Sequence, residues 1–219
     1  MKLLLITAHD SPRADETLRA ILSVLPRGGA GVQLRAPGAT ASALLGRARA
    51  MRPICAELSA PLLVNERLDV ALAAGADGAH LPARGISAGD ARALWARASA
   101  SGGHGARRDE NGARRGPLIG ASTHSLEEAR RAAREGADYA LFGPVWEVPD
   151  KGPARGLEAL RAAASEVPIP LFALGGVTAE NARQAIGHGA RGVACIRFVF
   201  GASDPAAAAI ALWQAVSTP

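Results

Sequence analysis

The sequence has few cysteines, lysines and aromatic residues, and each shortage excludes a class of protein. Its 219 residues include only two cysteines, Cys55 and Cys195, which lie far apart in apolar segments. This excludes a disulfide scaffold and a cysteine-rich metal site, and free thiols are typical of a reducing cytosol. Aromatic residues make up only 4% of the chain, so we expect a core of Ala, Leu, Val and Ile.

Long apolar runs are also missing. The N-terminal stretch Met1–Asp10 has an apolar run too short for a signal peptide or a membrane span. No later segment approaches about twenty apolar residues without a charge. Hydrophobic residues make up 48% and charged residues 21%, a balance typical of a globular chain. We therefore expect a soluble, cytoplasmic protein that does not bind membranes.

The net charge of +5 raises the question of nucleic-acid binding. Lys2 and Lys151 are the only lysines, and the remaining cations are arginines scattered along the chain. One cluster stands in the Gly-rich stretch 101–116, and it comprises Arg107, Arg108, Arg114 and Arg115. No aromatic residues interleave it and no nucleic-acid-binding motif accompanies it. We expect a solvated basic loop and no nucleic-acid partner.

Short β-type runs alternate with helical stretches along the whole chain. The predicted strands are Leu3–Thr7, Gly31–Arg35, Pro61–Val64, Gly78–Leu81, Leu118–Ala121, Tyr139–Phe142, Pro170–Leu174 and Arg191–Ile196. The helices are expected to begin near Ala14, Ala39, Glu66, Ser87, Ser125, Arg155, Thr178 and Asp204. Eight such units predict a (β/α)₈ TIM barrel of the α/β class. The alternative, an open doubly wound sheet, lacks a Gly-x-Gly-x-x-Gly motif after the first strand.

Three segments repeat one pattern, in which a helix ends on glycine and a buried strand follows. They are Ala73–Ala79, Glu135–Ala140 and His188–Ala194. Glycine suits the left-handed conformation after a helix end. The pattern favours a single domain over residues 1–219, with 101–116 a flexible insert on the N-terminal face of the barrel.

The residues at the carboxyl ends of barrel strands converge on one face, where barrel active sites form. In order these are His9; Gln33 and Arg35; Asn65 and Glu66; His80; Ser122, Thr123 and His124; the loop from Gly143 to Lys151; Gly175 and Gly176; and Arg197. Taken one by one, each has a structural explanation, such as a buried histidine or a helix cap. Their joint occurrence at one face predicts a site.

Two features predict a phosphorylated substrate. Gly175 and Gly176 open the helix after the seventh strand, where backbone N–H groups bind phosphate in many barrels. Arg35, Lys151 and Arg197 would add positive charge. No metal-ligand cluster for zinc stands in the sequence, so any metal would be Mg²⁺ bound to substrate phosphates, with Glu66 the only well-placed carboxylate.

Six stretches together resemble the thiamine phosphate synthase family, which includes the thiazole tautomerases of the TenI type. They are Val32–Arg35, Pro61–Leu72, Gly75–Leu81, Gly120–Ser125, Ala137–Val145 and Leu174–Thr178. They run in order over nearly the whole chain, and the family's fold is a (β/α)₈ barrel. The resemblance implies an enzyme of thiamine biosynthesis that couples hydroxymethylpyrimidine diphosphate to thiazole phosphate and releases pyrophosphate.

The resemblance also implies a role for each site residue. Gln33, Arg35 and Asn65 would hold the diphosphate, Glu66 would face Mg²⁺, and Lys151 would neutralise negative charge. Gly175 and Gly176 would seat the thiazole phosphate. The remaining implied substrate contacts are Ser122, Thr123 and Gly143, and His124 is the candidate proton carrier. Arg197 is predicted as a further substrate contact from its charge and its place after the last strand. The sequence leaves the oligomeric state open, a homo-oligomer included.

This chain departs from the synthase pattern at four places. Ala36 and Pro37 follow Arg35, the stretch Leu81–Gly85 lacks a metal-binding aspartate, Val148–Lys151 lacks two threonines, and Arg197 replaces a serine. These departures leave two alternatives open. One is a tautomerase acting on a thiazole carboxylate phosphate without metal, in which His124 carries the proton. The other is a non-catalytic paralogue that binds a thiamine-related phosphate.

Overall fold

The computed structural model describes residues 1–7, 13–100, 107–108, 114–149 and 151–217. The strands are β1 (Leu3–Ile6), β2 (Ala30–Leu34), β3 (Leu62–Asn65), β4 (Gly78–Leu81), β5 (Arg107–Arg108), β6 (Arg114–Arg115), β7 (Leu118–Thr123), β8 (Tyr139–Phe142), β9 (Leu171–Ala173) and β10 (Gly192–Cys195). The helices are α1 (Ala14–Ser23), α2 (Ala41–Glu57), α3 (Leu68–Ala73), α4 (Ala88–Ala100), α5 (Leu126–Arg134), α6 (Gly156–Glu166), α7 (Ala179–Gly187), α8 (Arg197–Phe200) and α9 (Pro205–Ser217).

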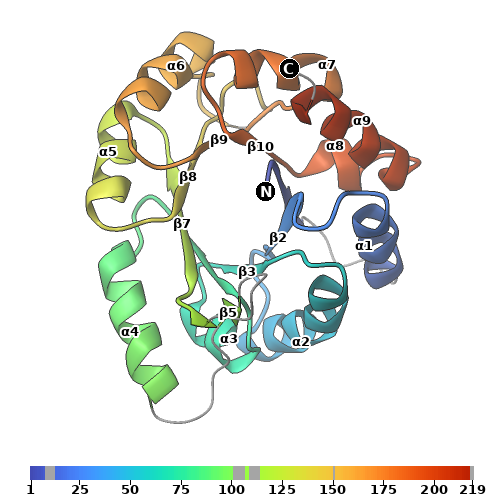
Figure 1. The fold of residues 1–219 in the computed structure, drawn as a ribbon, viewed down its shortest axis with the longest axis vertical. Coiled ribbons are helices and arrows are strands. Elements are labelled where there is room, and N and C mark those ends of the chain that lie inside the picture. Colours follow the sequence, from blue (N-terminus) through green and yellow to red (C-terminus); the bar gives the residue numbers. More distant parts are fainter. Residues whose placement is uncertain (8–12, 101–106, 109–113, 150, 218–219) are drawn as a thin grey trace.

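Eight of the strands close into a parallel barrel with helices around it. Their order is β1-β10-β9-β8-β7-β4-β3-β2, and the view along the barrel in Figure 1 shows the helices forming the outer ring. The chain is therefore a single-domain (β/α)₈ TIM barrel, as the sequence predicted. His9 and Asp150 lie outside the described residues, and so does most of the stretch 101–116.

The barrel has two apolar cores that follow from the alternation of side chains along each strand. The inner one contains only strand residues among its buried members, namely Leu4, Ile6, Leu63, Tyr139, Leu141, Phe172 and Ala194. The outer one lies between the strands and the helices, and alanines such as Ala129, Ala182 and Ala185 supply much of its helical side. Small side chains let the helices approach the barrel closely, which accounts for the low aromatic content.

At the N-terminal face of the barrel, the loop with the repeated glycine pattern is held by a set of hydrogen bonds and an ion pair. Gly75 follows α3 with φ +64°, and the carboxylate of the nearby Asp77 accepts a hydrogen bond from Leu62 N at 2.9 Å. Arg52 of α2 donates to the carbonyl of Gly75 at 2.7 Å and reaches Asp77 at 3.4 Å. The loop is thereby fixed to the start of β3.

The second repeat uses the same contacts. Asp138 accepts from Ile119 N at 2.6 Å, and Arg92 of α4 forms an ion pair with Asp138 at 2.6 Å. Arg92 also donates to the carbonyl of Gly136 at 3.1 Å. In the third repeat the aspartate position is taken by Arg191, whose backbone N–H donates to Leu171 O at 2.8 Å.

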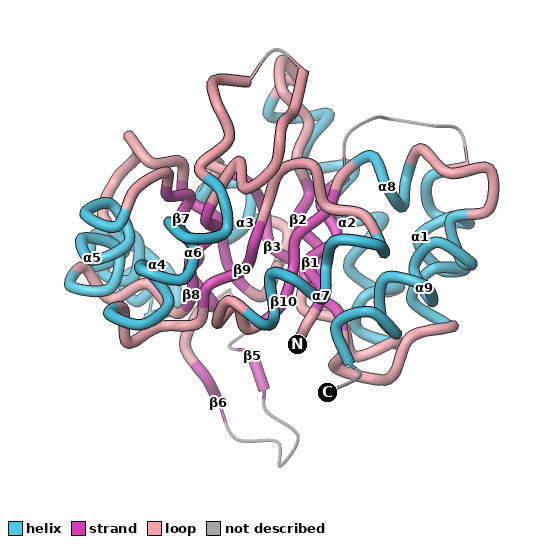
Figure 2. Tube along the Cα trace, turned by 90° about the horizontal axis from the view of Figure 1, so that it is seen from above, coloured by secondary structure: helices cyan, strands magenta, loops and turns pink. Residues whose placement is uncertain are grey.

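Three of the described elements, β5, β6 and α8, are not predicted by the sequence. β5 and β6 pair antiparallel, with Arg107 opposite Arg115 and Arg108 opposite Arg114. Figure 2 shows them projecting from the side of the barrel where the two termini lie, away from α8. The four-residue helix α8 is separated from β10 by the single residue Ile196, and Arg197 is its first residue.

Candidate active site at the C-terminal end of the barrel

The predicted site residues lie at the carboxyl ends of the barrel strands or in the loops that follow. Gln33 stands in β2 with Arg35 just after it, and Asn65 ends β3. The other members are Glu66 after β3, Ser122, Thr123 and His124 at the end of β7, Gly143 and Lys151 after β8, Gly175 and Gly176 after β9, and Arg197 after β10. Lys151 and Arg197 are exposed.

Gln33 and Asn65 form a preorganised amide pair between β2 and β3. Gln33 Nε2 donates to Asn65 Oδ1 at 2.8 Å, and Gln33 is only 2% exposed. The Gln33 Oε1 atom is buried and has no partner among the described residues. A buried amide oxygen without a donor is costly. It is therefore suited to accept a hydrogen bond from a ligand, while the Asn65 amide nitrogen can donate one.

Glu66 has a left-handed backbone conformation with φ +66°. Its N–H donates to the carbonyl of His80 at 2.8 Å, which ties the turn after β3 to β4. Non-glycine residues rarely adopt this conformation, and such residues cluster at functional sites. The Glu66 side chain is exposed and so can reach a ligand.

Hydrogen bonds orient His124 on both its backbone and its ring. Its backbone N–H donates to Glu128 Oε2 at 2.6 Å, and its Nδ1 lies 2.6 Å from the carbonyl oxygen of Gly143. Because a carbonyl oxygen only accepts, Nδ1 must carry the proton. The lone pair of the neutral ring is then on Nε2, which has no partner among the described residues and can accept a proton from a ligand.

Below this end of the barrel lies a buried polar chain that the sequence did not predict. The ring of His80 is 1% exposed, and its Nδ1 lies 3.2 Å from Tyr139 Oη and its Nε2 2.8 Å from Ser122 Oγ. Burial lowers the pKa of His80 to about 3, so the ring is neutral. Burial also raises the pKa of Tyr139, so the phenol keeps its proton. Tyr139 is the only tyrosine in the sequence, and a buried tyrosine hydroxyl usually has a partner, which was the available signal.

Thr123 does not take part in the hydrogen bonds that join Tyr139, His80 and Ser122. Its side chain is 1% exposed, and its hydroxyl donates to the carbonyl of Leu141 at 3.0 Å. That hydrogen bond joins β7 to β8, so the hydroxyl of Thr123 stabilises the pairing of these two barrel strands.

A cavity of about 330 Å³ opens between the ends of β9 and β10. It is lined by Val148, Leu174, Gly175, Gly176, Val177, Thr178, Ala194, Cys195, Ile196, Arg197 and Phe198. Gly175 and Gly176 have φ of +93° and +66°, and a Cβ on them would meet Pro144 and Trp146 respectively. Both positions therefore need glycine, and their bare backbone suits close approach of an anion at the start of α7.

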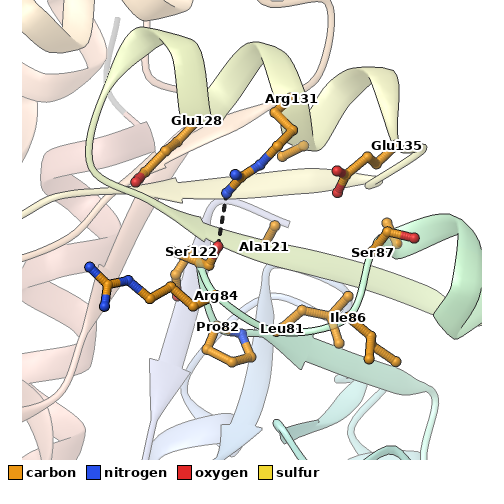
Figure 3. A pocket seen from close by; sticks show the side chains of 14 residues that line it. Leu81, Pro82, Arg84, Ile86, Ser87, Ala121, Ser122, Glu128, Arg131 and Glu135 are labelled. Carbon is orange, nitrogen blue, oxygen red and sulfur yellow. Dashed lines mark hydrogen bonds between the residues drawn. The ribbon is translucent and has the colours of Figure 1, made fainter.

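A second cavity lies between the β4–α4 loop and α5. Figure 3 shows Arg84, Glu128, Arg131 and Glu135 around it, and Arg131 donates to the carbonyl of Ala83 at 2.8 Å. Its lining carries both signs of charge and includes Ser122. The carboxylate of Glu128 that fixes His124 is thus also part of this wall.

The described residues contain no group of three or more His, Cys, Asp or Glu side chains that could hold a metal ion. Both cysteines are buried, and burial raises the pKa of each thiol to about 12, so neither is a nucleophile near neutral pH. Among the helices that the structure describes, none is both long and apolar enough to cross a bilayer. At this end of the barrel the described side chains supply hydrogen-bonding groups from Gln33 and Asn65, a candidate proton acceptor in His124, and positive charge from Lys151 and Arg197.

Comparison with known proteins assigns the family. The sequence profile of the family described as thiamine monophosphate synthase matches residues 3–199. A thiamine-phosphate synthase of Chlorobium luteolum is 37% identical over 220 residues, covering 99% of this chain and 93% of that protein. One of Methanoculleus marisnigri is 42% identical over 189 residues, covering 84% and 81%.

Solved structures agree with the sequence relatives. Thiamine phosphate pyrophosphorylase from Pyrococcus furiosus superposes with a TM-score of 0.81 at 31% identity, covering 99% of this chain and 95% of that one. A 3-hexulose-6-phosphate synthase gives a TM-score of 0.67 at 18% identity and shares the fold alone. From the matched profile, the relatives and the barrel, the chain belongs to the thiamine monophosphate synthase family.

Proposed function

We propose that this protein is a thiamine phosphate synthase, which couples hydroxymethylpyrimidine diphosphate to thiazole phosphate and releases pyrophosphate. The observation that carries the proposal is the buried Gln33–Asn65 pair, which stands at the same end of the barrel as the glycine-lined cavity at β9 and β10. The two features offer separate places for two substrates. The relatives named thiamine-phosphate synthases support the same reaction.

On the pyrimidine side, donors and acceptors fit an aminopyrimidine that carries a diphosphate. Gln33 Oε1 lacks a donor, and an amino group on the ring would supply one. The amide nitrogen of Asn65 and the guanidinium of Arg35 would donate to the diphosphate oxygens. The family resemblance implies that Gln33, Arg35 and Asn65 together hold the diphosphate. We assign Gln33 instead to the pyrimidine ring, because a hydrogen-bond acceptor such as Gln33 Oε1 does not bind an anion.

On the thiazole side, Gly175 and Gly176 would seat the phosphate against the N-terminus of α7, with Arg197 at the rim of the cavity. Lys151, exposed in the β8–α6 loop, would neutralise charge on the departing pyrophosphate. Loss of pyrophosphate leaves a pyrimidine cation that the thiazole nitrogen captures. The protein's own task is then to hold both partners in line and to stabilise the leaving group.

The donor set fits Mg²⁺ only as an ion bound mainly through the diphosphate. Glu66 is an exposed carboxylate directly after β3 that can face such an ion, and Mg²⁺ in phosphoryl sites is often held by one or two carboxylates plus phosphate oxygens. When bound, Mg²⁺ would stabilise the charge of the leaving pyrophosphate. The strained backbone of Glu66 supports a ligand-facing role for its side chain.

One observation favours a second candidate, the thiazole tautomerase. His124 has its tautomer fixed by the carbonyl of Gly143, which leaves Nε2 as a base. A ring nitrogen that accepts and then returns a proton is what a tautomerase needs. The synthase reaction needs no such base, so the role of His124 distinguishes the two.

The test is an assay of the purified protein with thiazole phosphate, hydroxymethylpyrimidine diphosphate and Mg²⁺, in which product is followed by thiochrome fluorescence. We expect thiamine phosphate, with activity lost when EDTA removes Mg²⁺. Asn65→Ala should raise the KM for the pyrimidine diphosphate about tenfold, the value of one charge-assisted hydrogen bond, and leave the KM for thiazole phosphate unchanged.

Two other outcomes would each replace the proposal. Absence of thiamine phosphate together with tautomer conversion that His124→Ala abolishes would establish the tautomerase. Binding of thiamine phosphate with neither turnover would leave a non-catalytic paralogue.

The free cysteines support a reducing, cytoplasmic location.

A further inference from the structure

His80 and Tyr139 meet inside the barrel because the strand between them carries a glycine. In the register of β4, β7 and β8, His80 pairs with Gly120 and Gly120 pairs with Tyr139. A Cβ on Gly120 would collide with the phenol ring of Tyr139. The missing side chain therefore lets a residue of β4 contact a residue of β8 across β7, with ring centroids 5.8 Å apart.

The direction of the hydrogen bonds in this chain follows from counting protons. The neutral imidazole has one N–H. Tyr139, a residue that is 2% exposed, has one O–H, and His80 Nδ1 is the hydrogen-bonding partner of that hydroxyl among the described residues. If Nδ1 carried the proton, the phenol hydrogen would be buried without an acceptor, which is costly. The phenol therefore donates to Nδ1, and Nε2–H donates to Ser122 Oγ.

This direction determines what Ser122 can do. Because its oxygen accepts from His80, its own hydrogen does not point at the ring, and no acceptor for it lies among the described residues. Ser122 is half-buried and is the next residue of β7 on the same side of the strand as Gly120. Its hydroxyl hydrogen is therefore left to donate to a ligand at the end of the barrel.

We infer that Tyr139 and His80 are positioning residues that fix Ser122 Oγ–H as a hydrogen-bond donor to an acceptor atom of the substrate, such as a ring nitrogen or a phosphate oxygen. The consequence for catalysis rests on the proposed function. The direction of the hydrogen bonds from Tyr139 through His80 to Ser122 does not depend on it. Ser122 is the residue that contacts substrate, and the two buried residues act through it.

The first test needs no substrate. A long-range ¹H–¹⁵N correlation spectrum of the protein labelled at histidine reports which imidazole nitrogen is protonated, and His80→Asn identifies the His80 signals. At pH 7 we expect the proton on Nε2 and none on Nδ1. A proton on Nδ1, or a mixture of the two tautomers, would overturn the inference.

The second test is a double-mutant cycle on kcat/KM. Tyr139→Phe removes the donor and keeps the ring, and it should lower kcat/KM about tenfold, as expected for one hydrogen bond. In a Ser122→Ala background the same change should cost less than about twofold, because coupled residues are not additive. If the losses of kcat/KM caused by Tyr139→Phe and by Ser122→Ala multiply in the double variant, the inference is contradicted.

Phe172→Leu is the matched control for packing. Phe172 contacts the Tyr139 ring edge-on at 5.6 Å but takes no part in the hydrogen bonds. Its effect should be the same in both backgrounds. If the wild-type protein makes no thiamine phosphate, the proposed function fails while the tautomer result stands, and the cycle is then measured on the Kd for thiazole phosphate. Additive effects there would overturn the inference as well.

Discussion

Asp77 illustrates how one buried carboxylate can hold several parts of the barrel. Its side chain accepts from Leu62 N and pairs with Arg52, and its own N–H donates to Leu62 O at 2.8 Å. Without the carboxylate, the N–H that begins β3 would be buried without a partner. The residue thus contributes to stability at the end of the barrel opposite to the site.

Asp77→Ala should lower the free energy of unfolding by about 2 kcal/mol, the cost of an unsatisfied buried donor. Urea unfolding followed by circular dichroism measures the loss. Asp69→Ala is the matched control, because the Asp69 side chain is largely exposed and its ion-pair partner is Arg67, two residues earlier in the sequence. It should cost under about 0.5 kcal/mol. Equal losses in the two variants would contradict the role given to Asp77.

Gly176 is the residue whose substitution should affect phosphate binding most directly. Gly176→Ala places a Cβ against Trp146 in a backbone of φ +66° and narrows the cavity. We expect the KM for thiazole phosphate to rise about tenfold, equivalent to about 1.4 kcal/mol. Gly187→Ala, at the other end of α7 with open space around it, should leave that KM unchanged. Steady-state kinetics with thiazole phosphate varied would measure both.

The sequence predicted the residues that follow strands better than the contacts between strands. The positions of Gln33, Asn65 and His124 at one end of the barrel could be predicted because strand ends converge in a parallel barrel. The partnership of His80 with Tyr139 could not be found, because it depends on the register across Gly120. The commitment of the Thr123 hydroxyl to Leu141 O also depends on the direction of a side chain.

Among the elements, those with strong local signals begin close to where the sequence predicted them. The Ser125 hydroxyl accepts from Glu128 N at 3.2 Å and caps the start of α5, and Thr178 and Asn181 form a capping box at α7. The short helix α8 was missed because four residues are too few for a periodic pattern. The β5–β6 pair was missed because the Gly-rich, charged stretch around it lacks apolar alternation.

The β5–β6 hairpin should be dispensable for activity. It projects from the face where the termini lie, on the side of the barrel opposite to α8 (Figure 2), and Arg197 and Phe198 of α8 line the cavity at β9 and β10. Replacing residues 101–116 with a short Gly-Ser linker should leave kcat and both KM values within about twofold, since surface connections tolerate changes in length. A large loss of kcat with normal stability would show that the hairpin contributes to the site.

At the scale of the whole molecule, the buried neutral His80 makes global stability depend on pH. In the unfolded chain a histidine binds a proton below about pH 6.5, whereas in the folded protein burial lowers the pKa of His80 to about 3. The unfolded state therefore binds more protons between these values. The free energy of unfolding should fall by roughly 1.4 kcal/mol for each pH unit below 6.5.

Urea unfolding at pH 7 and pH 5 would measure this dependence. Roughly 2 kcal/mol should be lost over that interval, within a range where most carboxylates stay ionised. His80→Gln removes the titrating group, so its smaller free energy of unfolding should be nearly the same at both pH values. A wild-type protein equally stable at pH 5 and pH 7 would show that His80 is protonated in the folded state.

Arg92 joins two parts of the chain that stretch 101–116 separates. It belongs to α4, before this stretch, yet its partners Pro117 O, Gly136 O and Asp138 all come after it. Each side of the stretch supplies four neighbouring barrel strands, β1 to β4 and β7 to β10. A polypeptide split within this stretch would therefore give two half-barrels, and Arg92 would help them reassociate into a two-chain enzyme.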